Sequence, residues 1–402
     1  MKQIWTLYRY EWKKIVKRRL VWICMAISAV MIAATVGGTV LDILYEDDGE
    51  TETMYQAFQK DKAYQKALEG KIINQELLEE TMAAYGTIPK DVERYSQTEE
   101  YEAYARPYSA IFQYIRIATD MVTKEARQWE ADERELYDMH LEMLMREADS
   151  CRLSQDEKDF WLAQEERKTW PVEFRYKEGY WRLLDCGYTI GLLAIVVTAI
   201  CLSGVFVEEH VRRTDQLILS SRHGRQKAFW AKFLAGLTFA LALSILFSGL
   251  SFLIAFGIYG AEGFTADFQL VSGGFFPPLN VGGAVLLYYA CMGIAVVFVA
   301  AFVMALSELL RSSIGTLSFV VGVVILGIFV NVPAHLRILA QAWSYLPSNF
   351  IANWNVFNAR LVGLFGKFLM PWQAVPMLYV ILGIGLAFLG RRAFMRYQVT
   401  GR

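Results

Sequence analysis

Hydrophobic residues gather in six long runs along the chain. The runs cover residues 20–41, 187–207, 233–258, 281–306, 314–332 and 373–390. A helix needs about 20 mostly apolar residues to cross the hydrocarbon core of a bilayer. All six runs reach or nearly reach that length, and none has a charged side chain in its middle. We therefore predict an all-α integral membrane protein with six transmembrane helices, the first over residues 20–44.

The segment before the first run, residues 1–19, alternates apolar and basic positions at helical spacing. Such a pattern is typical of an amphipathic helix that lies in the membrane interface. Aromatic rings settle at the depth of the lipid headgroups. We therefore predict an interfacial helix that contacts lipid through Trp5, Tyr8, Trp12, Lys13 and Lys17. A basic flank without a helix is the alternative.

Four basic clusters indicate the orientation. Lys and Arg are retained on the cytoplasmic side of a membrane, and they gather at the N-terminus, in residues 207–232, at Arg311 and from Arg391 onward. With six spans all four clusters fall on the same side, whereas residues 259–280, on the other side, contain no Lys or Arg. We predict a multi-pass plasma-membrane protein with both termini in the cytoplasm.

A long polar segment, residues 45–186, separates the first two runs and is called the insert below. It holds 33 of the 41 acidic residues, although the whole chain has a net charge of -1. Its Glu-, Lys- and Ala-rich stretches favour helices, and Ser154 with Glu157 matches a helix capping box. One stretch places four apolar residues on a shared helix face: Trp129, Leu136, Met139 and Met143. We predict an extracellular helical domain.

The loop over residues 333–372 is too apolar for a solvated linker. Pro333, Pro347 and Pro371 divide it into two short segments, which we predict to be a pair of helices dipping into the outer leaflet. Irregular backbone at that depth needs cover from protein. Within residues 187–402 the chain thus holds spans two to six, a cytoplasmic loop at 208–232 and this outer hairpin.

Residue types that carry catalysis or bind metals are sparse. The four histidines have no His or Cys partner at metal-ligand spacing, and GLFGKF at 363–368 lacks the Ser or Thr of a phosphate-binding loop. Of the cysteines only Cys151 and Cys186 lie outside the runs, and we favour free thiols. We predict no catalytic residue, cofactor or metal in this chain and no nucleic-acid partner.

The spans also lack the midplane carboxylates typical of ion-driven transporters. Their small residues, such as Ala301, Ala305, Gly322 and Gly327, favour close helix packing instead. The energy source is therefore expected in a partner. Residues 207–232, which are densely charged, form either a docking knob for that partner or a plain basic loop on the headgroups.

The order of residues in this loop resembles the cytoplasmic loop of type-2 ATP-binding cassette (ABC) transporter permeases. Glu209, Thr214, LILSS at 217–221, Gly224-Arg225 and Lys232 carry the resemblance. The N-terminal helix, six spans, apolar outer hairpin and basic tail are similar to that family too. The large insert is a departure, since many relatives have a short link there, and it leaves the substrate open.

The resemblance implies a permease subunit of an ATP-driven exporter of an amphiphilic substrate such as a peptide antibiotic, lipid or drug. A separate nucleotide-binding subunit would bind ATP and Mg, and a second permease, the same or homologous, would pair with this one. The loop would act as a coupling helix, and its contacts with the ATPase subunit would fall on Glu208, Glu209, Thr214, Asp215, Leu217, Leu219, Arg222 and Arg225.

Two other functions fit parts of the pattern. A membrane-anchored sensor or scaffold would use the insert to bind a ligand or partner, with the spans as a tether. An intramembrane enzyme would need polar catalytic groups within the spans, which hold only scattered Ser and Thr.

Overall fold

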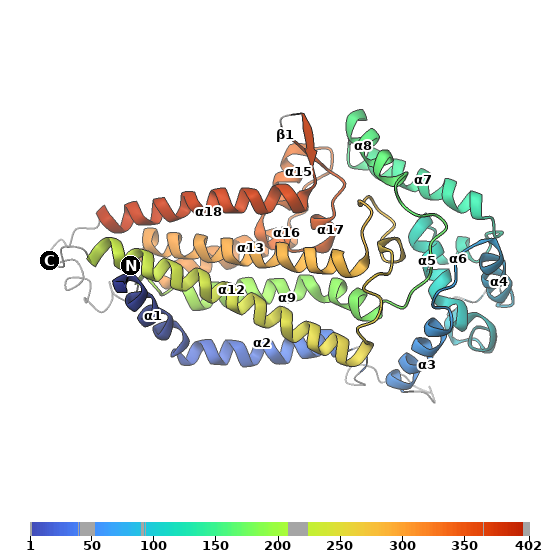
Figure 1. The fold of residues 1–402 in the computed structure, drawn as a ribbon, viewed down its shortest axis with the longest axis horizontal. Coiled ribbons are helices and arrows are strands. Elements are labelled where there is room, and N and C mark those ends of the chain that lie inside the picture. The colour runs from blue at the N-terminus through green and yellow to red at the C-terminus, as the bar shows by residue number, and fades with distance from the viewer. Residues whose placement is uncertain are drawn as a thin grey trace.

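A bundle of long helices forms the body of the protein (Figure 1). The computed structural model describes residues 2–38, 40, 53–89, 92, 94–207, 224–364 and 366–396. In this part of the chain the bundle consists of α2 (Arg19–Gly37), α9 (Glu178–Leu202), α12 (Gly224–Tyr259), α13 (Val281–Leu310), α14 (Ser313–Phe329) and α18 (Pro371–Arg396).

Five of these helices are long and apolar enough to cross a membrane, and α14 is the exception. With 17 residues it extends about 25 Å at 1.5 Å per residue, which is shorter than a hydrocarbon core of about 30 Å. A mostly helical membrane protein is therefore confirmed. The sixth span stays a prediction, because α14 needs help from other elements to fill the bilayer.

Two helices begin earlier than the hydropathy pattern indicated. The second span was predicted to begin at residue 187, whereas α9 begins at Glu178, and the third was predicted from residue 233, whereas α12 begins at Gly224. The additional turns are rich in polar and aromatic residues. Hydropathy detects only the part of a helix that lies in hydrocarbon, so it misses turns that project beyond it.

The central helix is α13, which packs against α9, α12, α14 and α18. Figure 1 shows it running between α18 and α9. Its buried tyrosines use their hydroxyl groups inside the protein: Tyr288 donates to the carbonyl oxygen of Ile351 at 2.6 Å, and Tyr289 to that of Leu183 at 3.1 Å. These bonds satisfy polar groups that would otherwise be buried at a cost.

The end of α2 is tied to α9 and α12. Arg182 of α9 donates to the carbonyl oxygens of Thr35 at 2.7 Å and Val36 at 3.2 Å, and the hydroxyl group of Tyr259 donates to Val36 at 3.0 Å. The last carbonyls of a helix lack partners within it, and a cation there also interacts favourably with the helix dipole. The polypeptide thus enters and leaves the insert at adjacent points.

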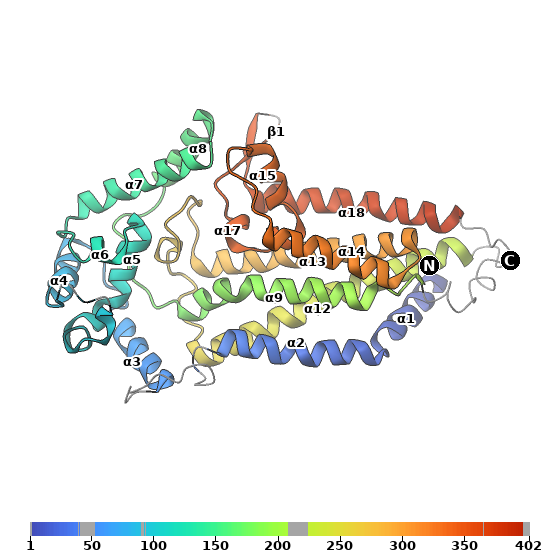
Figure 2. The same ribbon diagram turned by 180° about the vertical axis from the view of Figure 1, so that it is seen from behind.

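The insert lies at the end of the bundle opposite to α1 and the end of α18 (Figures 1 and 2). Its described part consists of α3 (Met54–Ala67), α4 (Gln75–Gly86), α5 (Ser109–Thr119), α6 (Thr123–Ala126), α7 (Glu133–Ser150) and α8 (Gln155–Glu165), with short turns η1 (Tyr95–Gln97), η2 (Tyr101–Ala105) and η3 (Arg106–Tyr108). Ser154 and Glu157 form the predicted capping box at the start of α8.

The buried stripe of α7 differs from the predicted one. The helix begins at Glu133, so Trp129 precedes it, and the side chains that it buries are Leu136, His140, Leu144 and Ala148. Met139 and Met143 are only partly buried. Spacing alone favoured the larger apolar residues, whereas the structure buries the polar His140 because partners satisfy both of its ring nitrogens.

Residues 333–372 fold differently from the predicted pair of helices. They form three short helices, α15 (Arg337–Ser344), α16 (Pro347–Phe350) and α17 (Asn353–Val356), followed by a hairpin of β1 (Val362–Leu364) and β2 (Lys367–Leu369). The strands are antiparallel, with Gly363 opposite Phe368. Residues 259–280, which contain η4 (Phe268–Leu270), also lie at the end of the bundle that carries the insert.

All five cysteines are free, which confirms the interpretation of Cys151 and Cys186.

Candidate functional site

The predicted contact with an ATPase subunit falls between α9 and α12, mostly outside the described residues. Seven of its residues lie there: Glu208, Glu209, Thr214, Asp215, Leu217, Leu219 and Arg222. Arg225 belongs to the first turn of α12. Lys232, which carried part of the family resemblance, is buried in α12, with its amine 5.6 Å from the ring centre of Phe206.

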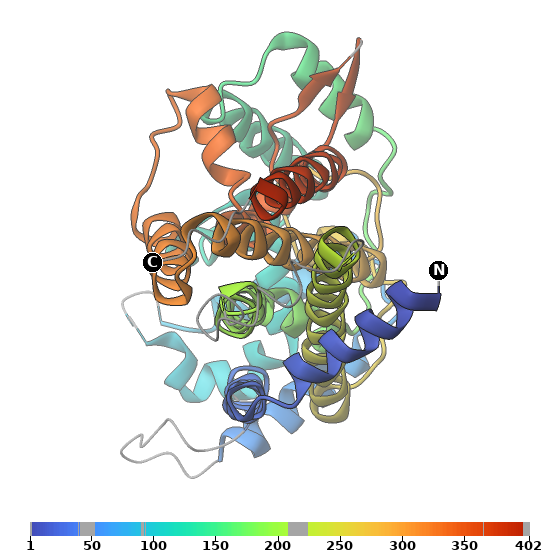
Figure 3. The ribbon, with the colours of Figure 1, turned by 90° about the vertical axis from the view of Figure 1, so that its left-hand side faces the viewer.

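The N-terminal helix α1 (Lys2–Val16) lies obliquely across α12 at the same end of the bundle (Figure 3). Tyr8 forms a hydrogen bond of 3.0 Å with the hydroxyl group of Thr238, and Trp12 meets Phe239 edge to face at 6.1 Å. Trp5, by contrast, is exposed. Of the five predicted lipid contacts, Trp5, Lys13 and Lys17 face outward, while Tyr8 and Trp12 are shared with α12.

The segment 333–372 is bound to the insert through Glu157. Arg337 in α15 donates from Nη2 to both carboxylate oxygens of Glu157, at 2.6 and 2.7 Å. The amide of Leu361 donates to the same carboxylate at 3.2 Å. Glu157 is buried, and its ionised form accepts hydrogen bonds from each neighbour. One side chain therefore connects α8, α15 and Leu361, the residue that precedes the strand β1.

Those hydrogen bonds govern the ionisation of Glu157. Burial by itself raises the pKa of a carboxyl group, because it disfavours the charged form. The bonds from Arg337, Ser154 and Leu361 outweigh burial and hold the pKa of Glu157 below its usual range. The connection between the insert and segment 333–372 is thus a true ion pair at neutral pH.

Further contacts join the insert to segment 333–372. The indole nitrogen of Trp161 in α8 donates to the carbonyl oxygen of Ala359 at 2.7 Å. An apolar cluster surrounds that bond, and its buried members come from the insert, from residues 259–280 and from segment 333–372: Leu144, Ala148, Leu153, Trp161, Phe275, Ala359, Leu361 and Met370. The insert and the two loops of the bundle therefore share one core at this end.

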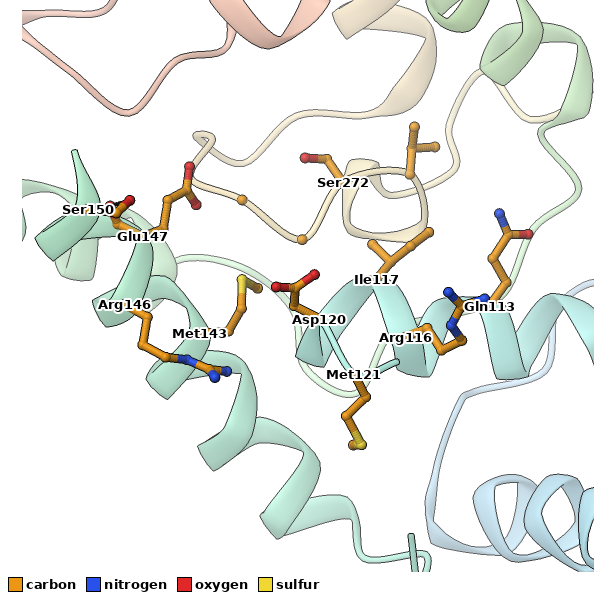
Figure 4. Close-up of a pocket in the computed structure, with 13 residues that line it drawn as sticks. Gln113, Arg116, Ile117, Asp120, Met121, Met143, Arg146, Glu147, Ser150 and Ser272 are labelled. Atoms are coloured by element: carbon orange, nitrogen blue, oxygen red, sulfur yellow. Dashed lines mark hydrogen bonds between the residues drawn. The ribbon is translucent and has the colours of Figure 1, made fainter. Parts of the chain in front are cut away.

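A cleft of about 840 Å³ lies between α5, α7 and residues 271–274 (Figure 4). Its lining includes two cations, Arg116 and Arg146, and two carboxylates, Asp120 and Glu147. The loop approaches α5 closely, because a Cβ atom on Gly273 would lie 1.9 Å from the carbonyl oxygen of Ile117. Only glycine fits there.

One carboxyl group on the acidic wall of this cleft, that of Glu147, has a raised pKa. Burial raises the pKa of Glu147, and the Asp120 carboxylate raises it further, against a hydrogen bond from the backbone of Phe275. The guanidinium of Arg116 keeps its Nε buried without a hydrogen-bond partner in the described part of the chain. With charges of both signs on its walls, the cleft suits a polar, zwitterionic ligand better than an apolar one.

His140 is a structural residue of the insert core. Its Nδ1 lies 2.9 Å from the carbonyl oxygen of Ala118, and its Nε2 lies 3.2 Å from Glu165 Oε1. The other oxygen of Glu165 accepts a hydrogen bond of 2.5 Å from Lys168. The imidazole and the carboxylate thus satisfy each other. Among the described residues no group of three His, Cys, Asp or Glu side chains is placed to hold a metal ion.

Sequence reasoning missed the role of the few cations in segment 333–372. Arg337 and Arg360 stand out in a segment that is otherwise apolar, and both reach the insert, since Arg360 donates from Nε to the carbonyl oxygen of Cys151 at 3.3 Å. An isolated Arg in an apolar loop was the available signal. Its partner was not visible, because Glu157 is 180 residues away.

The architecture defines a class of protein, a helical multi-pass membrane protein with a folded insert. Residues 5–357 match the family model described as ABC-2 family transporter protein, so the chain belongs to that family. No curated protein matches the sequence. The chain is accordingly a membrane component of an ABC transporter in the plasma membrane, and its family implies an ABC ATPase subunit as partner.

Proposed function

We propose that this chain is the permease subunit of an ATP-driven exporter that moves an amphiphilic substrate such as a peptide antibiotic, lipid or drug. The family match over residues 5–357 carries the proposal. A membrane chain of this family with no phosphate-binding loop of its own needs a separate subunit that binds ATP and Mg. Binding of ATP there would drive the spans between two arrangements.

The bundle end that holds α1 is the cytoplasmic end in this proposal. Basic residues of the described part gather there, including Arg18, whose guanidinium donates to the carbonyl oxygen of Cys201 at 3.2 Å, and Arg311 at the end of α13. Lys and Arg are retained on the cytoplasmic side. The insert then lies outside the cell, both termini lie inside, and α14 acts as the sixth span.

Residues 208–232 would dock on the ATPase subunit. Helix α9 ends and α12 begins at this same end, and Thr238 and Phe239 in the first half of α12 contact α1. Movement of this loop would therefore displace α9, α12 and the interfacial helix α1 together. A second permease subunit, the same or homologous, would complete the route by packing on an apolar face of the bundle that this chain leaves exposed.

The insert would select or shield the substrate on the outer side. The observation that supports this role is the connection between the insert and segment 333–372, because Glu157 and Trp161 hold the insert against the loop that covers α14. A substrate in the cleft of Figure 4 would touch α5 and α7. The last turns of α7 line the cleft through Met143 and Glu147 and also contribute Leu144 and Ala148 to the apolar cluster of that connection.

The first test is purification of the tagged chain from its native host in mild detergent, with mass spectrometry of whatever accompanies it. We expect an ATPase with a phosphate-binding motif to accompany the native chain and to be lost from an Arg222→Glu, Arg225→Glu double variant. Reversal of two charges at a docking site costs several kcal/mol, which is enough to abolish a complex of moderate affinity.

A matched control reverses two exposed charges of the insert, Lys124→Glu and Arg134→Glu. This variant changes the net charge equally, at the far end of the protein, and should retain the ATPase. Absence of any ATPase from the native chain would remove the energy source of the exporter. It would favour the membrane-anchored sensor or scaffold, whose insert binds a ligand while the spans act as a tether.

A further inference from the structure

A second cavity, of about 440 Å³, lies where α14 ends and segment 333–372 begins. Figure 2 shows this region, with α14, α15 and α17 close to one another. Tyr188 of α9 and Gly327 of α14 line the cavity from the bundle, and Trp343, Trp354 and Arg360 line it from the segment. The cavity therefore sits at the insert end of the spans, at the level where the shortest helix of the bundle stops.

One cation faces this cavity without an anion. Arg360 is 8% exposed, and its one side-chain hydrogen bond in the described part of the chain runs from Nε to the carbonyl oxygen of Cys151. Its two Nη groups have no hydrogen-bond partner there, and no described carboxylate forms an ion pair with it. Asp and Glu are also missing from the described residues that line the cavity.

A charge buried to this extent is costly unless an anion and hydrogen bonds compensate it. A guanidinium group has a planar set of donors that matches a carboxylate or a phosphate. The Nη groups of Arg360 are donors of this kind, and Arg360 lines the cavity. An anionic group that enters the cavity would supply a partner for these donors.

The rim of the cavity is apolar and aromatic. Ile328, Val330 and Trp354 line it and are 46%, 42% and 62% exposed. Trp354 also packs on the ring of Tyr188 at 5.4 Å. In a membrane protein such side chains face lipid, and Trp and Tyr favour the depth of the headgroups. An occupant of this site therefore joins an anionic head to an apolar body.

We propose that this cavity binds an anionic phospholipid, with its headgroup phosphate on Arg360 and its acyl chains along the exposed face of α14. The lipid also compensates for the short length of α14, because its headgroup fills the space above the end of the helix. The inference concerns binding to this chain alone, so it stands apart from the exporter proposal. Its test needs neither ATP nor an ATPase subunit.

A purely structural role for Arg360 makes a different prediction. Cys151 ends α7, and a cation at a helix C-terminus stabilises the helix. If capping were its whole role, replacement of Arg360 would lower stability and leave lipid binding unchanged. Arg360→Gln separates the two roles, because the glutamine amide still has a donor for the Cys151 carbonyl but carries no charge.

The experiment is native mass spectrometry of the full chain in a neutral detergent, with phosphatidylglycerol or phosphatidylcholine added at equal concentrations. We expect phosphatidylglycerol to be retained preferentially by the native chain. Arg360→Gln should weaken its binding by about ten- to a hundredfold, the effect of losing charged hydrogen bonds. Arg146→Gln, which removes a cation from the cleft of Figure 4 instead, should bind like the native chain.

Trp354→Ala serves as a second variant in case Arg360→Gln fails to fold, since Trp354 is exposed and lies at the rim. It should weaken phosphatidylglycerol binding at least severalfold, because it removes the aromatic anchor. Equal retention of both lipids, or unchanged binding in both variants, overturns the proposal. So does displacement of the lipid by glycerol phosphate alone, since that result identifies a site for a free phosphate.

Discussion

At the scale of single residues, Glu157 carries several functions at once. It caps the start of α8 together with Ser154, accepts two hydrogen bonds from Arg337, and accepts one from the amide of Leu361. Each of these partners would be left with an unsatisfied group if the carboxylate were lost, and such groups are expensive when buried. Loss of this side chain is therefore expected to destabilise both the insert and segment 333–372.

Glu157→Gln should lower the stability of the protein by about 3 kcal/mol, because it breaks a mostly buried ion pair. Lys158→Gln is the matched control. It removes the neighbouring ion pair with Asp149. The Asp149 side chain is exposed, so this pair contributes about 1 kcal/mol or less. Thermal unfolding in detergent measures both. Equal midpoints for the two variants would contradict the assignment of Glu157 as a central contact.

The same contact predicts a dependence on pH. The pKa of Glu157 in the folded protein is lower than in the unfolded chain, where a Glu side chain titrates near about 4.3. The ion pair therefore contributes fully above the unfolded value, and its contribution is lost as the pH falls through the folded value. The difference in unfolding temperature between the native chain and Glu157→Gln should accordingly shrink as the pH is lowered below about 4.

At the scale of elements, glycine allows α9 and α13 to approach each other closely. A Cβ atom on Gly187 would lie 2.2 Å from Cε1 of Tyr288. That ring is fixed, because its hydroxyl group donates to Ile351 in segment 333–372. Of the small residues expected to mediate packing, Gly327 meets Ser348 and Asn349, whereas Gly322 has open space around it. Small residues thus mark helix contacts only where a partner helix is present.

Gly187→Ala should destabilise the bundle by about 1–3 kcal/mol, the usual cost of forcing an extra atom into a packed core. Gly257→Ala in α12 is the control, since nothing lies within 4 Å of the added Cβ atom. There the better helix propensity of alanine should raise stability slightly. Unfolding midpoints of the two variants should therefore move in opposite directions, and a neutral Gly187→Ala would show that Tyr288 is able to move.

At the scale of the whole molecule, the insert is part of the transporter rather than an appendage. It shares an apolar core with two loops of the bundle, and its entry and exit points are held together where Arg182 binds the last carbonyls of α2. The two helix ends that flank the predicted ATPase contact, the end of α9 and the start of α12, lie at the other end. The two ends can therefore be altered separately.

Replacement of residues 50–170 by a short linker tests this arrangement. Because α2 and α9 meet at Arg182, the linker can join them without displacing the spans. We expect export or resistance to be altered, while the ATPase subunit still accompanies the shortened chain through a purification. Unchanged export would contradict a substrate role for the insert, and loss of the ATPase would show that the two ends are not independent.

The amino-acid sequence by itself determined the class of the protein. Runs of apolar residues identified the five helices that are long and apolar enough to cross a membrane. The capping box at Ser154 marked the start of α8. Both signals are readable because hydropathy and capping depend on neighbours in the chain. The pattern from Glu209 to Lys232 pointed to the family that the match over residues 5–357 confirms. These features are local, so no knowledge of the fold was needed to detect them.

Only the tertiary structure decided which distant residues meet. Tyr176 and Tyr180 lie just before the second hydrophobic run, where tyrosine is typical of an anchor at the membrane interface. Both are nevertheless buried against α12 and the loop after it. The capping box marks Glu157 and the apolar surroundings mark Arg337, but only the packing of α8 on α15 shows that the two side chains form an ion pair. Contacts of this kind depend on how helices pack, and packing is set by the shapes of surfaces that are remote in sequence.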